Sequence, residues 1–199
     1  VLAPFRLPPA AATGAMPRAP LVLIDLETDA GITGRAYLFA FTPAAQKPIV
    51  EFIHGIAPLI VGDAVAPLDL DAKLRKRHTL IDTPGLVGLA LAGLDMCAWD
   101  AAAQIRGVPL AVLLGGSVKP IKAYNSCGLW IQPVSGVADE AESLAAEGGF
   151  SAVKLRIGRD DPAQDLAAVR AVKDRLGDRV AVDQVGRGTG EVGALHGGP

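Results

Sequence analysis

The chain of 199 residues is poor in cysteine and aromatic side chains and has no excess of charge of either sign. Its only cysteines, Cys97 and Cys127, lie in different local contexts without metal-type spacing, which indicates two reduced thiols and a cytoplasmic protein. The formal net charge of -2, from 19 basic and 21 acidic residues, is interspersed along the chain. We therefore expect no nucleic-acid partner and no membrane partner, and we favour a small-molecule partner.

Neither end of the sequence has the features of a targeting segment. The chain starts at Val1 without a basic and then apolar leader, and no apolar run there is long enough to cross a bilayer. The stretch 186–199 holds six glycines and has no periodicity. We expect a cut edge at the N-terminus and a Gly-rich aberrant tail at residues 186–199.

The first half of the chain has the pattern of an α+β domain. Two apolar runs between Leu21 and Phe41 flank a polar turn at Asp29–Gly31, which predicts an antiparallel hairpin. Thr42 and Pro43 then form the start signal of a helix, because a threonine side chain caps a helix and proline fits its first turn. Further helices are predicted over 68–78 and 85–106, and the second of these is apolar almost all round, as in a helix buried between two layers.

The second half alternates short apolar runs with helical segments. Strands are predicted at 121–126, 150–157 and 180–183, and helices at 136–147 and 161–176. Such alternation in units of about 30 residues predicts parallel strands with right-handed crossovers, in an open sheet or a barrel. No glycine-rich phosphate-binding motif follows any of these strands, which favours the barrel.

Polar residues that close these strands are the candidates for chemistry, because reactive groups project from the carboxyl ends of barrel strands. Alternation along a strand puts Lys154 and Arg156 on one face. They are either solvated charges or part of a site that anions or a metal balance. Asp183 is the nearest candidate anion, with a helix N-cap as its alternative role.

The stretch at 92–116, AGLDMCAWDAAAQIRGVPLAVLLGG, resembles the signature of the mandelate racemase and muconate-lactonizing family of the enolase superfamily. The stretch APLVLIDLETDAGITGRAYLFAFTP at 19–43 is similar to mandelate racemase in particular, and KAYNS and AVKLRIG continue the match. The resemblance covers roughly residues 3 to 183. It implies an α+β capping domain followed by the first part of a TIM-type (β/α) barrel, about three of its eight strands. We therefore divide the chain into 1–115, an enolase-type capping domain with its junction helix, 116–185, an incomplete barrel, and 186–199, the tail.

The resemblance also implies an activity. Members remove the proton alpha to a substrate carboxylate, and Mg²⁺ neutralises the enolate that forms. Lys154 matches the supporting lysine of the family's Lys-x-Lys motif, whereas Arg156 stands where the base should be. Asp183 matches the first of three metal carboxylates, and Val185 replaces an asparagine common in the family. Ser126 matches a contact to the substrate carboxylate. Phe41 and the segment 13–16 fall where specificity loops lie, although Phe41 could equally belong to the core.

The departure at Arg156 affects the reaction class, because a guanidinium is effectively never deprotonated in proteins. Arg156 can bind a carboxylate better than it can abstract a proton, which favours one-sided dehydration over two-base racemisation. We predict part of an Mg²⁺-dependent racemase or acid-sugar dehydratase acting on a small carboxylate, a 2-hydroxy acid or an acid sugar, and forming a homo-oligomer when intact. The chain alone is predicted to be inactive and prone to aggregate. The alternative is a non-catalytic product, truncated, frameshifted or a pseudoenzyme, whose cap domain serves oligomerisation.

Overall fold

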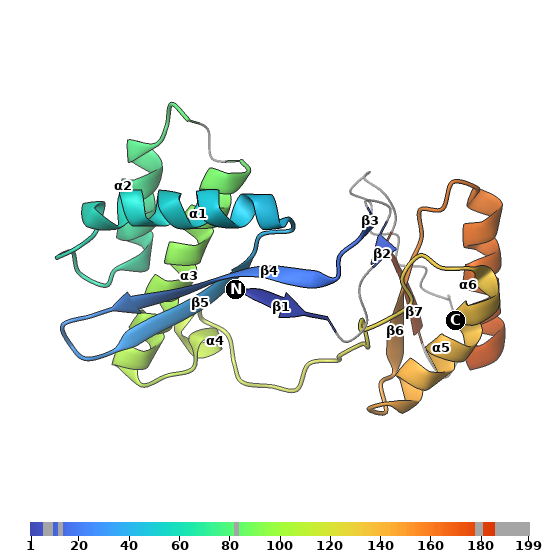
Figure 1. The fold of residues 1–199 in the computed structure, drawn as a ribbon. Helices are drawn as coiled ribbons and strands as arrows, with labels where there is room; N and C mark the ends of the chain where they lie inside the picture. The colour runs from blue at the N-terminus through green and yellow to red at the C-terminus, as the bar shows by residue number, and fades with distance from the viewer. Residues whose placement is uncertain (6–9, 12–13, 82–83, 178–180, 186–199) are drawn as a thin grey trace. The chain divides into compact units, whose positions relative to one another are not determined.

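A computed structural model describes residues 1–5, 10–11, 14–81, 84–177 and 181–185 (Figure 1). The predictions for the segment 13–16 and for the tail 186–199 lie wholly or partly outside these residues. The chain divides into two compact units. The capping unit comprises Val1–Pro4 and Arg18–Lys119, and the barrel unit comprises Phe5–Pro17 and Pro120–Pro199.

The capping unit contains the predicted hairpin. Strand β4 (Arg18–Glu27) pairs antiparallel with β5 (Thr33–Phe39), and the short β1 (Leu2–Pro4) pairs with the start of β4. Gly31 occupies the turn with a φ of 72°, a left-handed conformation that glycine adopts without steric cost. Thr28 closes the turn, because its hydroxyl donates to the Ile32 carbonyl at 2.8 Å. The prediction for this region is confirmed.

Helices cover the inner face of this sheet. They are α1 (Pro43–Ile56), the 3₁₀ turn η1 (Ala57–Leu59), α2 (Pro67–Arg77), α3 (Leu86–Arg106) and the short α4 (Leu110–Leu113). Thr42 caps α1 as predicted, and its hydroxyl accepts from the Ala44 N–H at 3.4 Å. Helix α3 packs on both long strands and on α1 and α2. The core residues shared by these elements include Val22, Ile24, Leu38, Ile49, Ile53, Leu91, Leu94 and Cys97.

Helix α3 is long and apolar enough to cross a membrane by length and composition. Half of its most apolar window is buried inside the structure, against the sheet and the other helices. A buried core helix of a soluble protein passes the same test. The burial therefore supports its prediction as a core helix between two layers, and its composition alone does not indicate a span.

The barrel unit contains two helix–strand repeats. Helix α5 (Val134–Ala146) precedes β6 (Ala152–Arg156), and α6 (Pro162–Leu176) leads to β7 (Ala181–Val185), which pairs parallel with β6. Val153 and Leu155 are completely buried and pack against both helices. In the first part of the chain, two very short strands, β2 (Ala10–Ala11) and β3 (Gly14–Ala15), pair with each other. The parallel βα start of a barrel is thus present.

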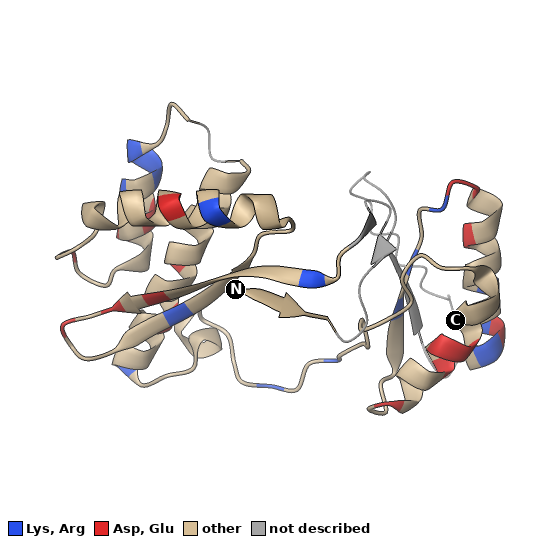
Figure 2. Ribbon diagram, in the orientation of Figure 1, with Lys and Arg blue, Asp and Glu red and all other residues tan. Residues whose placement is uncertain are grey.

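Two strand predictions in the barrel unit are wrong in extent. The strand expected at 121–126 is reduced to one parallel bridge between Asn125 and Val153, because Ile121 and Tyr124 are exposed and bury no apolar face against the helices. The strand expected to close at Asp183 continues through Gln184 to Val185, since both residues pair with β6. Charged residues of both signs are interspersed along both units (Figure 2), as the composition predicted.

Candidate active site

Strand β6 carries the central pair of candidate residues. Val153 and Leu155 point into the helix-covered core, so the alternation of the strand puts Lys154 and Arg156 on the opposite face, where both are half-buried. The prediction that these two cations share a face is confirmed. The partial burial of Lys154 and Arg156 argues against the alternative that they are freely solvated charges at a strand end.

The segment that crosses this face is anchored by Asn125, a buried polar residue. Its backbone N–H donates to Ala152 at 2.9 Å and its carbonyl accepts from the Lys154 N–H at 3.1 Å. Its side-chain amide donates to the Leu144 carbonyl and to Glu147, and its side-chain oxygen accepts from the Cys127 N–H. These bonds fix the path of the chain immediately before and after Ser126.

Ser126 lies directly against Arg156. One guanidinium nitrogen donates to the Ser126 carbonyl and hydroxyl, each at 3.2 Å, and the other donates to the Gly128 carbonyl at 2.7 Å. Burial lowers the pKa of Arg156 below its usual range, and the nearby Tyr124, Cys127 and Glu140 oppose that shift. An arginine remains protonated at neutral pH even so. Ser126 and Arg156 therefore form one polar cluster with a fixed positive charge.

Trp130 completes this cluster, and the sequence reasoning missed it. The guanidinium carbon of Arg156 lies 3.6 Å from the centroid of the indole ring, a close cation–π stack. Leu129, which precedes Trp130, is completely buried. Its φ of 52° lies in the left-handed region, which residues other than glycine rarely adopt. Among the described residues, the indole N–H of Trp130 is buried without a hydrogen-bond partner. A lone tryptophan in the loop after the first predicted strand was the only sequence signal for this residue.

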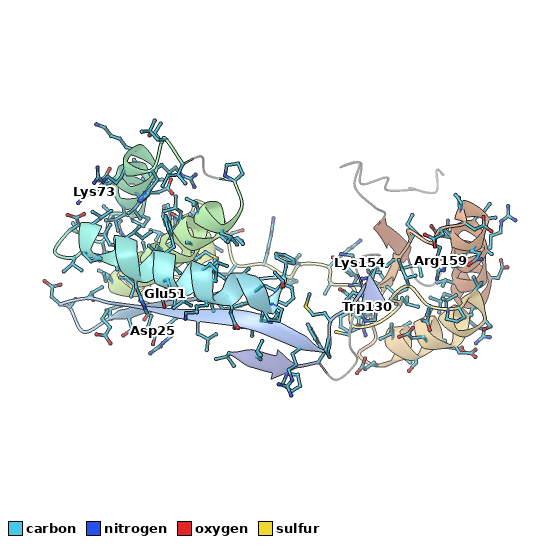
Figure 3. All side chains as sticks on the ribbon, turned by 45° about the horizontal axis from the view of Figure 1, so that its top comes forward. Asp25, Glu51, Lys73, Trp130, Lys154 and Arg159 are labelled. Carbon is cyan, nitrogen blue, oxygen red and sulfur yellow. The ribbon has the colours of Figure 1, made fainter. Side chains whose placement is uncertain are left out.

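Lys154 makes a separate aromatic contact. Its ammonium lies 5.7 Å from the centroid of the Tyr124 ring, near the outer limit of a cation–π interaction. Figure 3 labels Lys154 and Trp130, which belong to this unit. Two cations and a hydroxyl thus lie on one side of β6, and this combination suits the binding of a carboxylate.

Asp183 belongs to the neighbouring strand. Its Cα pairs with that of Lys154 in the parallel register of β6 and β7. It lies in the middle of β7 and not at its end, because the strand continues to Val185. Among the described residues no group of three or more His, Cys, Asp or Glu side chains could hold a metal ion. One aspartate position does not amount to an Mg²⁺ site, because Mg²⁺ takes octahedral oxygen coordination.

Phe41 belongs to the capping unit, whereas the other candidate residues belong to the barrel unit. Its side chain is 65% exposed, so the alternative that it is a core residue is wrong. It contacts Phe39 edge to face, with 4.8 Å between ring centroids, and its φ is 58°. An exposed aromatic ring held in a left-handed backbone conformation is compatible with a specificity position.

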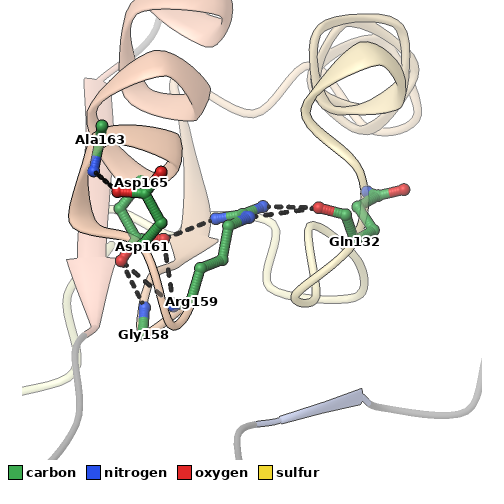
Figure 4. Close-up of polar contacts among 6 residues, drawn as sticks. All are labelled: Gln132, Gly158, Arg159, Asp161, Ala163 and Asp165. Atoms are coloured by element: carbon green, nitrogen blue, oxygen red, sulfur yellow. Dashed lines mark hydrogen bonds and ion pairs between the residues drawn. The ribbon is translucent and has the colours of Figure 1, made fainter.

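A buried ion pair stabilises the loops around the cluster (Figure 4). The Arg159 guanidinium binds the Asp165 carboxylate at 2.7 Å and donates to the Gln132 carbonyl at 2.9 and 3.2 Å. Asp165 also accepts from the backbone N–H groups of Gly158 and Arg159. The network ties the segment after Trp130 to the loop after β6, so its role is to hold the site in shape.

Comparison with known proteins identifies the family of this chain. Residues 1–115 match the model of the mandelate racemase / muconate lactonizing enzyme N-terminal domain, and residues 136–193 match an enolase C-terminal domain-like model. L-talarate/galactarate dehydratase of Salmonella typhimurium is 25% identical over 161 residues, which are 79% of this chain and 40% of that protein. Other relatives are cycloisomerases and an epimerase.

Solved structures show the same fold. An enolase from alpha proteobacterium BAL199 with bound Mg is 41% identical, with a TM-score of 0.86, over 92% of this chain and 52% of that one. An enolase from Bradyrhizobium, complexed with magnesium and mandelic acid, is 38% identical with a TM-score of 0.83, over 92% and 50%. The chain thus spans about half the length of the relatives that it matches.

Proposed function

Because the chain belongs to the mandelate racemase and muconate lactonizing enzyme family, we propose that it supplies the capping domain and first barrel strands of an enzyme that removes the proton alpha to a carboxylate. The observation that carries the proposal is the cationic cluster on β6, in which Arg156 is bonded to Ser126 beside Lys154. The substrate is a small 2-hydroxy acid or an acid sugar. The reaction is racemisation or dehydration.

Arg156 binds the substrate carboxylate and does not act as the base. Its guanidinium is held by Ser126, Gly128 and the Trp130 ring, and it keeps its proton at neutral pH. Its bonds to the Ser126 carbonyl, the Ser126 hydroxyl and the Gly128 carbonyl use three of its five N–H groups, which leaves two donors for a carboxylate. Lys154 adds positive charge on the same face and favours the developing enolate.

This arrangement favours dehydration. A racemase needs a base on each face of the alpha carbon, and an arginine in the second-strand position cannot take a proton from its side. In a dehydration, one base removes the alpha proton and a carbon–carbon double bond forms as the bond from the neighbouring carbon to its hydroxyl breaks. The leaving hydroxyl takes up one proton, so the net loss is one water. The base would come from a part of the protein beyond the described residues.

Relatives suggest the substrates to test. The Salmonella typhimurium relative is a talarate/galactarate dehydratase, and the Bradyrhizobium structure holds mandelic acid. The cluster on β6 suits the carboxylate that both compounds carry. Mg²⁺ is expected in the whole enzyme, with Asp183 as one ligand. The described residues do not form its site, so no step proposed for this chain depends on the ion.

The test uses a fusion of residues 1–185 to the matching second half of the BAL199 relative. ¹H NMR in D₂O follows loss of the alpha proton of mandelate and of galactarate, and formation of the dehydrated product. We expect galactarate dehydration and no racemisation of mandelate. Arg156→Ala should raise KM at least tenfold, because the carboxylate loses a charged partner.

Arg156→Lys is the matched variant, because it restores a side chain that can act as a base. We expect it to bring no gain in alpha-proton exchange if Arg156 serves as a carboxylate binder. Racemisation by the unmodified fusion, or a large gain in exchange with Arg156→Lys, would contradict this assignment. A folded fusion that binds Mg²⁺ but exchanges no alpha proton of either substrate would favour the non-catalytic alternative. The chain of 199 residues alone should be inactive in the same assay.

A further inference from the structure

Trp130 lies in a loop whose conformation destabilises the folded state. The preceding Leu129 has a left-handed backbone, with a φ of 52°. Among the described residues, the indole N–H of Trp130 is buried without an acceptor, whereas the indole of Trp99 bonds to the Asp95 carboxylate. A strained backbone and an unpaired buried donor both cost free energy. Costs of this kind gather at places where the position of a side chain matters for function.

The groups around Trp130 converge on one residue, Arg156. The Ser126 carbonyl and hydroxyl and the Gly128 carbonyl accept from its guanidinium. The Leu129 carbonyl accepts from its backbone N–H at 3.1 Å. The indole ring covers one face of the guanidinium, with 3.6 Å between the guanidinium carbon and the ring centroid. The loop therefore contacts the cation along its edge and over one face.

These contacts of Arg156 are all with uncharged groups. Among the described side chains, no carboxylate forms an ion pair with Arg156. Glu140 lies near enough to favour the charged guanidinium, but its carboxylate bonds to the Gln132 amide. The bonds to the loop leave two N–H groups of the guanidinium for another acceptor. A cation held in this way is suited to binding an external carboxylate.

A stacked ring controls the tilt of a guanidinium. An arginine side chain has many rotamers, so a free one loses conformational entropy when it binds a carboxylate. The hydrogen bonds at the edge of Arg156 restrain its position, whereas the Trp130 ring restrains the tilt of its plane. A guanidinium that is ordered in advance binds a planar carboxylate more tightly, because less ordering remains to be done on binding.

We propose that Trp130 is a positioning residue, whose ring holds the Arg156 guanidinium in the orientation in which two N–H groups bind the substrate carboxylate. The inference rests on the proposed function and adds a residue that acts through Arg156, without contact to the reacting atoms. The stack, and not a hydrogen bond of its own, orients the ring, which accounts for the unpaired indole N–H. Because the ring face carries this role, phenylalanine can replace the tryptophan.

The test measures carboxylate binding by the 199-residue chain, with mandelate as the probe and its neutral amide, mandelamide, as the control ligand. Dissociation constants come from amide shifts in ¹H–¹⁵N spectra. Trp130→Leu and Trp130→Phe are the matched variants. Both remove the indole N–H and keep an apolar side chain, but only phenylalanine has a ring face.

We expect the unmodified chain to bind mandelate at least tenfold more tightly than mandelamide, because only mandelate carries a carboxylate for Arg156. Trp130→Leu should weaken mandelate binding at least fivefold, and Trp130→Phe less than twofold. Neither variant should strengthen or weaken the binding of mandelamide.

The double variant Trp130→Leu/Arg156→Ala distinguishes positioning from packing. If Trp130 acts through Arg156, the leucine substitution adds less than twofold to the loss that Arg156→Ala causes alone. A ring that only fills the core would weaken mandelate binding by the same factor whether or not Arg156 is present.

A measurement on the unmodified chain does not depend on the folding of any variant. The ¹⁵N order parameter of the Arg156 Nε–H should be near about 0.85, as in a rigid backbone. The Arg35 side chain, which is 70% exposed, is the comparison and should give a value below about 0.6.

Four results would each overturn the inference. They are equal binding of mandelate and mandelamide by the unmodified chain, equal losses in the two Trp130 variants, independent losses in the double variant, and a mobile Arg156 Nε–H. Failure of the proposed function looks different, because the fusion would then be inactive while Trp130 and Arg156 stay coupled in mandelate binding. An active fusion with any of the four results would reject the role of Trp130 alone.

Discussion

The paired strands of the capping unit are close together in the sequence, whereas those of the barrel unit are far apart. In the capping unit, β4 and β5 are joined by a tight turn, and α3 then covers their inner face. In the barrel unit, β6 and β7 are parallel, so a whole helix separates Ala152 from its partner Ala181. Hydrophobic packing dominates the first unit, whereas buried polar contacts hold the loops of the second. The two units should therefore fail through different kinds of substitution.

Each unit contains one tryptophan, Trp99 in the capping unit and Trp130 in the barrel unit. Trp99→Phe or Trp130→Phe leaves one fluorophore, so the unfolding of each unit by urea can be followed separately. Substitutions in each unit can be compared in these backgrounds.

The largest effect is expected from Asp165→Ala in the barrel unit. Arg159 is only 5% exposed, so loss of its partner leaves a buried charge unpaired, at a cost of about 3–5 kcal/mol. Trp130 fluorescence should report unfolding at much lower urea, while Trp99 is unaffected. Asp139→Ala removes an exposed partner of Arg175 and is the control, with little expected change. Equal effects of the two substitutions would refute the importance of the buried pair.

A smaller effect is expected from Gly34→Ala in the capping unit. A Cβ atom at Gly34 would lie 2.1 Å from the backbone oxygen of Cys97, so β5 and α3 would have to separate. Overpacking of this kind costs about 1–3 kcal/mol. Trp99 fluorescence should report the loss and Trp130 should not. Gly55→Ala in α1 meets no atom within 4 Å and should stabilise the unit slightly, because alanine favours helix. A neutral Gly34→Ala would show that the helix and hairpin adjust without cost.

The smallest effect is a dependence on alkaline pH. Burial raises the pKa of Cys97 to about 11, from 9.0. The folded state thus favours the neutral thiol, and this contribution is complete below pH 9 and is lost as pH rises towards 11. At pH 10 the loss is about 1 kcal/mol, seen in urea unfolding followed by Trp99. Cys97→Ala should remove this part of the pH dependence, and Cys127→Ser in the barrel unit should leave it intact. The same slope in both variants would assign it to other groups.

Local patterns in the sequence sufficed for the capping unit. Thr42 and Pro43 predicted the start of α1, and the turn at Asp29–Gly31 predicted the hairpin. These signals act between residues that are close in sequence, so they can be read without knowing the fold. The same holds for the shared face of Lys154 and Arg156, which needs only the alternation of one strand.

The arrangement of the barrel unit was predicted less well. The end of β7 was misplaced by two residues, because pairing with β6 and not composition sets where a parallel strand stops. The stack of Arg156 on Trp130 could not be predicted, since it depends on how the loop bends at Leu129. The assignments of Lys154 and Arg156 to catalysis, of Ser126 and Phe41 to substrate binding and of Asp183 to the metal stay predictions until the fusion is assayed.

Leu129 is an apolar residue that helps to determine where the charge of Arg156 lies. Its left-handed backbone costs free energy, and the complete burial of its side chain offsets that cost. A variant at this position could keep every polar atom of the cluster and still misdirect Arg156, by releasing the bend that presents the Trp130 ring. Selection for a substrate would then act on Leu129, a residue that does not contact the substrate. A survey of sequence variation that considers only polar residues would miss this position.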